Sequence, residues 1–417
     1  MNIAIIGGGA AGMMAAATIQ EQFPDMHEIF LVEKNPGLGR KVIISGGGRC
    51  NVTTGLQQVR ELLTKYPRGS KFLNAAMHQF PPAHVYAWFE VHGVPLKIEK
   101  DLRVFPRSND GKDIVGVFER LFRTSKTTLL LHHHVQEIKK INNQFALVYK
   151  DGSTLTVDRL ILTTGGQARR YTGSSGDGYT FAESLGHTIT PLAPSLNAFL
   201  IKEAWPKTIS GVSFERVTIS AYTPKKIYTF TGPLLFTHRG ISGPAVFALS
   251  SLVAFEHYDQ HTPLPVQIDF FPGESFAALE KRVCAAMATS QKTFFKNTLR
   301  LFLPKSVAEI CCDQIHIPLE RKNIETSKAH VHGAVTWMKG ARLHAIGRGS
   351  GDEFVTAGGV NLQEVNPSTM QSRITPGLFF AGELLDIDGF TGGFNLQASW
   401  ATGRLAGMHA GKPIARV

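Results

Sequence analysis

A chain of 417 residues is too long for one compact domain and predicts two or three. The hydrophobic content of 43% and the charged content of 18% are those of a folded globular protein, and no apolar run reaches the length of a membrane span. Four irregularly spaced cysteines and the lack of a signal-peptide pattern argue against a secreted disulfide framework, so we expect a cytoplasmic protein.

The first fifty residues hold the pattern around which the rest of the chain is organised. Residues 2–6 form a short apolar run typical of a buried parallel strand, and three glycines within 7–12 then complete G-x-G-x-x-G. An alanine-rich helical segment follows, and a second apolar run, 29–32, ends at Glu33, where an acid can bind a ribose hydroxyl. The glycines allow a tight turn and the close approach of a pyrophosphate, which the helix N-terminus stabilises. This order of features predicts a dinucleotide site.

The glycine turn alone does not distinguish NAD from FAD, because both contain an ADP half, and the residues after Glu33 add information. A loop at 36–41 carries two cations, and 45–51 reads Ser-Gly-Gly-Gly-Arg-Cys-Asn, a backbone that can pass close to a flat or anionic group. Residues 2–51, and above all 45–51, resemble the bacterial aminoacetone-oxidase-like flavoproteins, the BaiN-like group. The resemblance implies that the bound dinucleotide is FAD, and it places Cys50 beside the isoalloxazine ring.

A strand at 129–135 is predicted to carry three consecutive histidines. Successive side chains of a strand point to opposite faces, so these histidines do not converge, and we expect no metal site. Further on, Asp151-Gly152 predicts a hairpin, and 160–166 predicts a buried strand that ends in a glycine turn. The resemblance implies that Val135 contacts the adenine through its main chain, and that the strand's final turn passes near the diphosphate.

From about residue 191, short β-type runs separated by Pro, Gly and Ser predict an antiparallel sheet or a small barrel. Within it, 237–244 reads Thr-His-Arg-Gly-Ile-Ser-Gly-Pro, and an apolar helical segment follows, for which Ser242 is the expected cap. This string is a signature of the resembled family. It implies that His238 faces the flavin pocket, and the alternative is a histidine bonded within its own loop.

Residues 275–333 predict a helix-rich insertion in which positive charge is concentrated. Between Ser275 and Ser350, twelve lysines and arginines stand against five acidic residues, an excess of +7 out of the chain's +11. Such an excess suits an anionic partner, with RNA as the candidate, and the alternative is a solvated basic surface. Six cations recur at spacings that can line one face of the helices: Lys281, Arg282, Lys292, Lys296, Arg300 and Lys305.

Two strand-like runs that contain glycine, 354–360 and 377–383, return the chain to its first domain. The second is followed by acidic residues, a glycine-rich turn and an alanine-rich helix to about residue 406. The N-terminus of that helix can meet the electron-rich edge of a flavin, so the segment predicts the second half of an FAD site. No second G-x-G-x-x-G lies between a strand and a helix, and 347–351 is predicted as a loop. NAD(P)H is therefore expected to bind only transiently.

These patterns and the full-length resemblance predict an α/β fold. It consists of an FAD-binding Rossmann-like domain of the glutathione-reductase type, with an inserted β-barrel-like domain and a small helical insertion. The expected boundaries are 1–190 and 354–417 for the FAD-binding domain, 191–274 and 334–353 for the β-rich domain, and 275–333 for the helices. The residues expected to bind FAD are Gly7, Gly9, Ala11, Gly12, Glu33, Lys34, Arg40, Lys41, Ser45, Gly46, Gly47, Arg49, Cys50, Asn51, Val135, Thr164, Gly165, Gly382, Glu383, Asp386, Gly392, Gly393, Phe394, Asn395 and Leu396.

The resemblance implies an FAD-dependent oxidoreductase. Some members of the family reduce uridine to dihydrouridine in large-subunit ribosomal RNA, and the basic insertion favours this reaction. The alternatives are oxidation of a small amine such as aminoacetone, and a non-catalytic FAD-containing protein that binds RNA or another partner. Reduction of a pyrimidine needs a proton donor, for which Cys50 and His238 are the candidates. Alternatively, Cys50 only packs beneath the flavin.

Overall fold

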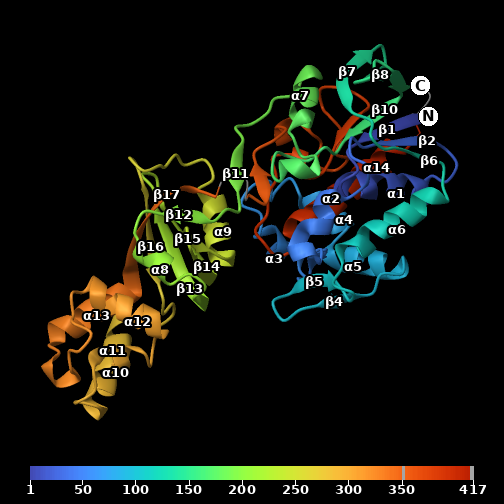
Figure 1. Cartoon of the computed structure of the whole chain (residues 1–417). Coiled ribbons are helices and arrows are strands. Elements are labelled where there is room, and N and C mark those ends of the chain that lie inside the picture. The colour runs from blue at the N-terminus through green and yellow to red at the C-terminus, as the bar shows by residue number, and fades with distance from the viewer. Residues whose placement is uncertain (350–352, 414–417) are drawn as a thin grey trace. The chain divides into compact units, whose positions relative to one another are not determined.

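The computed structural model describes residues 1–349 and 353–413. The chain divides into two compact units, the first formed by Met1–Pro194 with Phe354–Val417 and the second by Ser195–Glu353 (Figure 1). Both ends of the chain thus build the first unit, and the second is inserted between them.

A five-stranded parallel sheet forms the centre of the first unit, in the order β19-β10-β1-β2-β6. Its strands are β1 (Asn2–Ile6), β2 (Glu28–Val32), β6 (Thr127–Leu130), β10 (Arg159–Leu162) and β19 (Leu378–Phe380). Ile5 of β1 pairs with Leu31 of β2 and with Ile161 of β10, so the carboxyl ends of these strands meet at one edge. Parallel strands are buried on both faces, which explains why these segments are continuously apolar.

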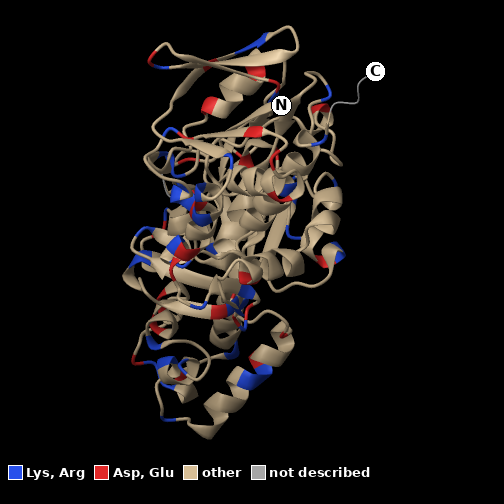
Figure 2. Cartoon of the chain, turned by 90° about the vertical axis from the view of Figure 1, so that its right-hand side faces the viewer, with Lys and Arg blue, Asp and Glu red and all other residues tan. Residues whose placement is uncertain are grey.

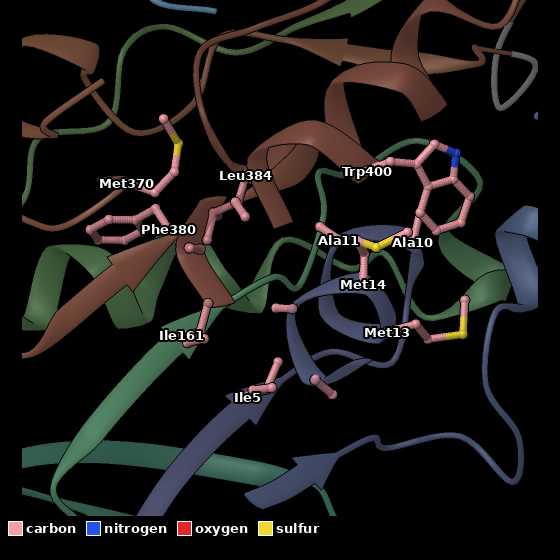
Figure 3. Close-up of a cluster of buried hydrophobic side chains, with 14 of the residues drawn as sticks. Ile5, Ala10, Ala11, Met13, Met14, Ile161, Met370, Phe380, Leu384 and Trp400 are labelled. Carbon is pink, nitrogen blue, oxygen red and sulfur yellow. The ribbon is translucent and has the colours of Figure 1, made fainter. Parts of the chain in front are cut away.

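Two helices from opposite ends of the chain, α1 and α14, pack closely against each other. A Cβ atom at Gly403 of α14 would lie 2.3 Å from the carbonyl oxygen of Ala11, and one at Gly407 would lie 2.5 Å from that of Ala15. Glycine at both positions lets the two backbones approach. Figure 3 shows the buried cluster beside them, with Trp400 from α14. The helices of the first unit are α1 (Ala10–Gln22), α2 (Arg40–Ile44), α3 (Val59–Leu63), α4 (Asn74–Gln79), α5 (Pro82–Val91), α6 (Gly111–Arg123), α7 (Asp177–Ser184) and α14 (Phe394–Ala410), with short 3-10 turns η1 (Ser45–Gly48), η2 (Arg170–Thr172), η4 (Leu362–Glu364) and η5 (Gly382–Leu384).

Smaller sheets complete this unit and correct one prediction. They are β3 (Thr53–Thr54), β5 (Arg103–Pro106) and β4 (Leu96–Ile98); β7 (Val135–Ile141), β8 (Gln144–Tyr149) and β9 (Thr154–Val157); and the pair β11 (Ala193–Ser195) and β18 (Val355–Ala357). The predicted hairpin at Asp151-Gly152 is confirmed, since it joins β8 to β9. The single strand predicted at 129–135 is wrong. β6 ends at Leu130, and the histidines lie in a turn in which His132 has a φ of 59°.

The second unit contains a closed antiparallel barrel in the order β12-β15-β14-β13-β16-β17. Its elements are β12 (Phe199–Ile201), α8 (Trp205–Thr208), β13 (Ser213–Tyr222), β14 (Ile227–Thr237), β15 (Gly240–Ser242), α9 (Pro244–Leu252), β16 (Leu264–Asp269) and β17 (Ala341–Arg348). Closure removes the exposed sheet edges that would otherwise pair with other chains. The expected cap at Ser242 is wrong, because Ser242 is still part of β15. Gly243, with a φ of 99°, precedes α9 instead.

The predicted helices lie between β16 and β17 and share the core of the barrel. They are α10 (Phe276–Thr289), α11 (Phe295–Leu299), α12 (Lys305–Gln314) and α13 (Lys328–Gly340), with the 3-10 turn η3 (Asn323–Glu325). Leu279 and Met338 are fully buried in one apolar cluster with strand residues such as Ile268. Residues 347 and 348 of the predicted loop belong to β17, and 350 and 351 lie outside the described residues. Within the described residues, none of the helices combines the length and the apolar character that crossing a bilayer requires.

Candidate functional site

The glycine turn between β1 and α1 borders an open space. A Cβ atom at Gly12 would lie 2.0 Å from the carbonyl oxygen of Gly7, so Gly12 is required for the packing of the turn itself. A Cβ atom at Gly9 would meet no atom within 4 Å. Gly9 is also the residue before α1, and the first N–H groups of a helix have no partner within it. The open space therefore lies where a phosphate would be stabilised by the helix.

Glu33, directly after β2, ties this turn to the following loop. Its carboxylate accepts the N–H of Gly8 at 2.8 Å, and the backbone and side-chain N–H groups of Asn35 at 2.9 and 2.6 Å. The Arg40 guanidinium donates to the Asn35 side-chain oxygen at 2.9 Å. A carboxylate has about four acceptor positions, so capacity remains for the predicted ribose hydroxyl.

Two predicted cofactor-binding cations are held in ion pairs. The Lys34 ammonium lies 2.6 Å from the Asp177 carboxylate, and the Lys41 ammonium lies 2.6 Å from that of Glu383. The second Glu383 oxygen accepts the N–H of Thr356 at 2.9 Å. These bonds join the loop after β2 to α7, and α2 to the turn after β19. The two lysines thus position distant segments around the glycine turn.

The segment 45–51 has an unusual backbone. Gly46, Gly47 and Gly48 have φ values of 56°, 72° and 87°, in the left-handed region that favours glycine. A Cβ atom at Gly47 would meet no atom within 4 Å, so this turn also borders open space. The Arg49 guanidinium is held elsewhere, 2.9 Å from the Glu99 carboxylate and 3.7 Å from the centre of the Phe105 ring. Ser45 donates to the carbonyl oxygen of Val42 at 2.7 Å.

The N-terminus of α14 meets the end of this segment. A Cβ atom at Gly393, the residue before α14, would lie 2.2 Å from the carbonyl oxygen of Thr53 and 3.0 Å from the side-chain oxygen of Asn51. Asn395 supports the turn through two bonds of 2.8 Å to the backbone of Gly389. A Cβ atom at Gly382 would lie 2.9 Å from that of Ala11, so the turn after β19 touches α1. Of the other expected residues here, Gly392 has a φ of 134°, Phe394 is buried and Leu396 is partly buried.

Several buried polar atoms of the first unit lack a hydrogen-bond partner among the described residues, and the Thr164 hydroxyl and one Asp386 oxygen are two of them. Burial raises the pKa of Asp386, whose other oxygen accepts the Thr190 hydroxyl at 3.1 Å. Unpaired buried polar groups are costly, so a ligand that bonds to them would stabilise the protein. Thr164 precedes Gly165, which has a φ of 73°, and Val135 is the buried first residue of β7.

The residues present fit FAD. The pyrophosphate suits the open space at Gly9, Glu33 retains capacity for the ribose, and the segments 45–51 and 392–396 suit the flavin end. The buried hydroxyl of Thr164, in the same unit, has no hydrogen-bond partner among the described residues and is available to bond to the cofactor. These assignments remain predictions for the individual residues.

The structure adds residues that the sequence analysis missed. Thr163 donates its hydroxyl towards the carbonyl oxygens of Ile6 and Gly7, at 2.9 Å each, and so fixes the glycine turn. Asp177 pairs with Lys34, and Asn35 bonds to Glu33. The Gly-Asp-Gly run at 176–178 marks the start of α7, but nothing in the sequence pairs it with residue 34.

Cys50 is fully buried and has a φ of 56°, a strained value for a residue with a side chain. Burial raises the pKa of its thiol to about 12, an effect that a hydrogen bond with Ser45 only partly offsets. The thiol therefore stays protonated at neutral pH, and protein atoms enclose it. These observations favour a packing role over contact with substrate.

We predict that Cys50 resists alkylation in the native protein. With iodoacetamide at mildly alkaline pH, the exposed Cys284 is expected to react, whereas the buried Cys50 lacks both access and thiolate. Mass spectrometry of proteolytic peptides measures the modification of each, and the denatured protein, in which all four cysteines react, is the control. Modification of native Cys50 at the rate of Cys284 would contradict the burial argument.

His238 lies exposed in the turn between β14 and β15. The Thr237 hydroxyl oxygen accepts the N–H groups of Arg239 and Gly240, at 3.4 and 3.2 Å, and so shapes this turn. His238 belongs to the second unit and Cys50 to the first. Its predicted role at the flavin stays a prediction.

Comparison with known proteins identifies the family. The family profile described as "HI0933-like protein Rossmann domain" matches residues 1–409. The chain belongs to this family. The resemblance inferred from the motifs is thereby confirmed, and family membership makes the protein a flavoprotein and an FAD-dependent oxidoreductase.

The family includes curated relatives with different substrates in their names. The chain is 29% identical to a 3-dehydro-bile acid delta(4,6)-reductase of Clostridium scindens, over 98% of both chains. It is 29% and 30% identical to ribosomal RNA dihydrouridine synthases of Escherichia coli and Haemophilus influenzae, over 95% of each chain.

Solved structures share the fold. A 3-ketosteroid delta1-dehydrogenase from Sterolibacterium denitrificans superposes with a TM-score of 0.52 at 12% identity, covering 98% of this chain and 99% of that one. The FrdA subunit of Escherichia coli quinol fumarate reductase gives 0.51 at 16% identity, covering 98% and 69%. The predicted fold class, a Rossmann-type FAD domain with an inserted barrel, is confirmed.

Proposed function

We propose that the protein reduces a uridine of large-subunit ribosomal RNA to dihydrouridine, with transiently bound NAD(P)H as the reductant. The observation that carries the proposal is the site of the first unit that fits FAD, with open space at Gly9, the residue before α1, and at Gly47. The choice of substrate is supported by the two ribosomal RNA dihydrouridine synthases in the family and by the excess of positive charge at 275–350.

The proposed reaction balances as uridine, NAD(P)H and one proton giving dihydrouridine and NAD(P)⁺. The double bond of uracil is conjugated to a carbonyl group, so hydride adds to the carbon remote from that carbonyl and a proton adds to its neighbour. The flavin, once bound and reduced by NAD(P)H, would supply the hydride. Gly9 and Glu33 have to orient the cofactor. Another residue of this chain has to hold the proton near the uracil carbon next to the carbonyl group.

A small-molecule substrate is the second candidate. The relative from Clostridium scindens is named for the reduction of a bile acid and matches over almost the whole of both chains. That name also describes reduction of ring double bonds, so the chemical step is similar while the substrate is small. Oxidation of a small amine is a third possibility, and it reverses the direction of electron flow.

The deciding experiment measures electron flow and product together. Under anaerobic conditions, NADPH or NADH is expected to bleach the flavin absorbance of the purified protein. Unmodified ribosomal RNA should then restore the absorbance and gain two hydrogens at a uridine, which mass spectrometry of RNA digests detects. Bleaching that only an enone steroid reverses would favour the small-molecule alternative. Bleaching by aminoacetone would favour the amine oxidase, and a flavin that none of these compounds alters would favour the non-catalytic alternative.

We predict that the two candidate proton donors differ. His238→Ala is expected to lower turnover by about 10²–10⁴-fold, the range for loss of a general acid. Cys50→Ser is expected to keep turnover within about tenfold, because the buried thiol with a pKa of about 12 is a poor acid at neutral pH. Stopped-flow reoxidation of the reduced flavin by substrate measures both, and unchanged FAD content is the control. The reverse pattern would identify Cys50 as the donor.

A further inference from the structure

Within the helical part of the second unit, the segment from α10 to α13, two stretches of chain run side by side as a short antiparallel pair. Phe294 and Lys322 face each other in a β-bridge. The N–H of Phe295 donates to the carbonyl oxygen of Arg321 at 2.8 Å, and the N–H of Asn323 donates to that of Thr293 at 2.9 Å. Residues 291–295 and 321–324 are thus in fixed register, although the sequence separates them widely.

This register gives the pair one buried face. Phe295 and Asn323 are buried, with 0% and 3% of their surface exposed. The Asn323 amide donates to the carbonyl oxygen of Ser290 and to the Thr298 hydroxyl, at 2.8 Å each. Phe294 and Lys322 are extended and directly precede these two buried residues, so they point to the opposite, outward face, whereas Lys296 lies in the first turn of α11 and Ile324 in η3. The buried asparagine therefore fixes the backbone of the pair.

The outward face combines cations with apolar side chains. Lys292 and Lys322 are exposed, Ile324 is 67% exposed, and Phe294 is half-buried. The Lys296 ammonium lies 5.6 Å from the centre of the Phe294 ring. We call these five residues, Lys292, Phe294, Lys296, Lys322 and Ile324, the Lys-Phe face.

Some of the basic residues between Ser275 and Ser350 are neutralised by ion pairs. Arg282 pairs with Glu274 at 2.7 Å, and Arg300 pairs with Glu309 at 2.6 Å. Residues 1–349 and 353–413 provide no ion pair for the three lysines of the Lys-Phe face. The nearest acid along the chain, Glu325, accepts the backbone N–H of Lys322 at 3.2 Å. Figure 2 shows basic and acidic residues interspersed along the chain, so total charge alone does not locate a binding surface.

We propose that the Lys-Phe face binds a single-stranded segment of RNA, with the three lysines on phosphates and Phe294 stacked on a base. Cations beside a half-buried aromatic ring match the two needs of single-stranded RNA, neutralisation of phosphates and a surface for an unstacked base. This inference rests on the proposed function, because it names the surface that would hold the ribosomal RNA substrate. Of the six cations expected from sequence it keeps Lys292 and Lys296, and it adds Lys322.

The test compares two charge reversals of equal size. One variant carries Lys292→Glu, Lys296→Glu and Lys322→Glu, and its control carries Lys202→Glu, Lys207→Glu and Lys225→Glu at exposed positions of the barrel region. Fluorescence anisotropy with a single-stranded ribosomal RNA fragment is measured from low to high salt. Each phosphate contact contributes about 0.7 to the log–log salt slope, so the first variant is expected to lose about two units while the control keeps the wild-type slope.

A third variant separates stacking from charge. Phe294→Ala is expected to weaken binding about fivefold or more, with an unchanged salt slope, because the stacked base is lost and the phosphate contacts remain. FAD content and bleaching by NADPH without RNA should be the same in all variants, since these properties belong to the first unit.

The outcomes separate this inference from the proposed function. If the wild type forms dihydrouridine and both charge reversals bind RNA equally, the Lys-Phe face is overturned and the function stands. If the Lys-Phe variant alone loses RNA affinity but the wild type forms no dihydrouridine, the surface stands and the reaction is wrong. RNA affinity that is negligible in the wild type overturns the surface and favours a small substrate.

Discussion

Gly9→Val is expected to yield a folded protein that purifies without FAD. The residue has a φ of −81° and a ψ of −170°, an extended conformation that valine adopts readily, and the space beside it holds no protein atom within 4 Å. The new side chain therefore does not disturb the apoprotein, but it occupies the space assigned to the pyrophosphate. FAD released on denaturation, measured per mole of protein, checks the loss of cofactor.

Gly12→Val is the informative comparison, because the same change should act on the fold. Its Cβ atom would lie 2.0 Å from the carbonyl oxygen of Gly7 and 2.7 Å from the Thr163 hydroxyl. Since bound FAD stabilises the folded state by itself, the melting temperatures of the two apoproteins are compared. The Gly9→Val apoprotein should have the melting temperature of the wild-type apoprotein, and the Gly12→Val apoprotein should have a much lower one. Stoichiometric FAD in Gly9→Val would show that the pyrophosphate lies elsewhere.

Gly403→Ala is expected to lower the free energy of unfolding of the first unit by about 1–3 kcal/mol, the usual cost of overpacking. The added methyl group would lie 2.3 Å from the carbonyl oxygen of Ala11 and 3.0 Å from its Cα atom, so α14 has to move away from α1. The N-termini of both helices belong to the predicted FAD site, so FAD affinity should fall with stability. Thermal release of flavin and loss of helical circular dichroism measure the two effects.

Gly116→Ala is the matched control within the same unit. Gly116 lies inside α6, and its Cβ atom would meet only the flexible end of Arg120, at 3.5 Å. Alanine should stabilise this helix by about 0.5–1 kcal/mol. The same chemical change thus has opposite expected signs in two helices. Equal effects of both substitutions would mean that the contact between α1 and α14 does not limit stability.

The sequence by itself determined the class of the protein and the order of its parts. Parallel strands buried on both faces require continuous apolar runs, and a phosphate-binding turn requires glycine, so β1, β2 and the turn at 7–12 were readable locally. The hairpin at Asp151-Gly152 and the barrel after residue 191 were likewise predictable from turn residues and short β-type runs. Each of these patterns is formed by residues that are close together in the sequence, so it can be recognised without the tertiary structure.

Only the tertiary structure decided which distant residues meet. The pairing of Lys34 with Asp177 and of Lys41 with Glu383 depends on the packing of whole elements, and local pattern carries no record of it. The strand predicted at 129–135 failed because the paired length of β6 is set by its neighbour β2. The tertiary structure also decides how Gly9 and Gly12, two glycines of one motif, differ in their surroundings. The space around each is defined by what packs against the turn, and one of them faces open space while the other faces the backbone of Gly7.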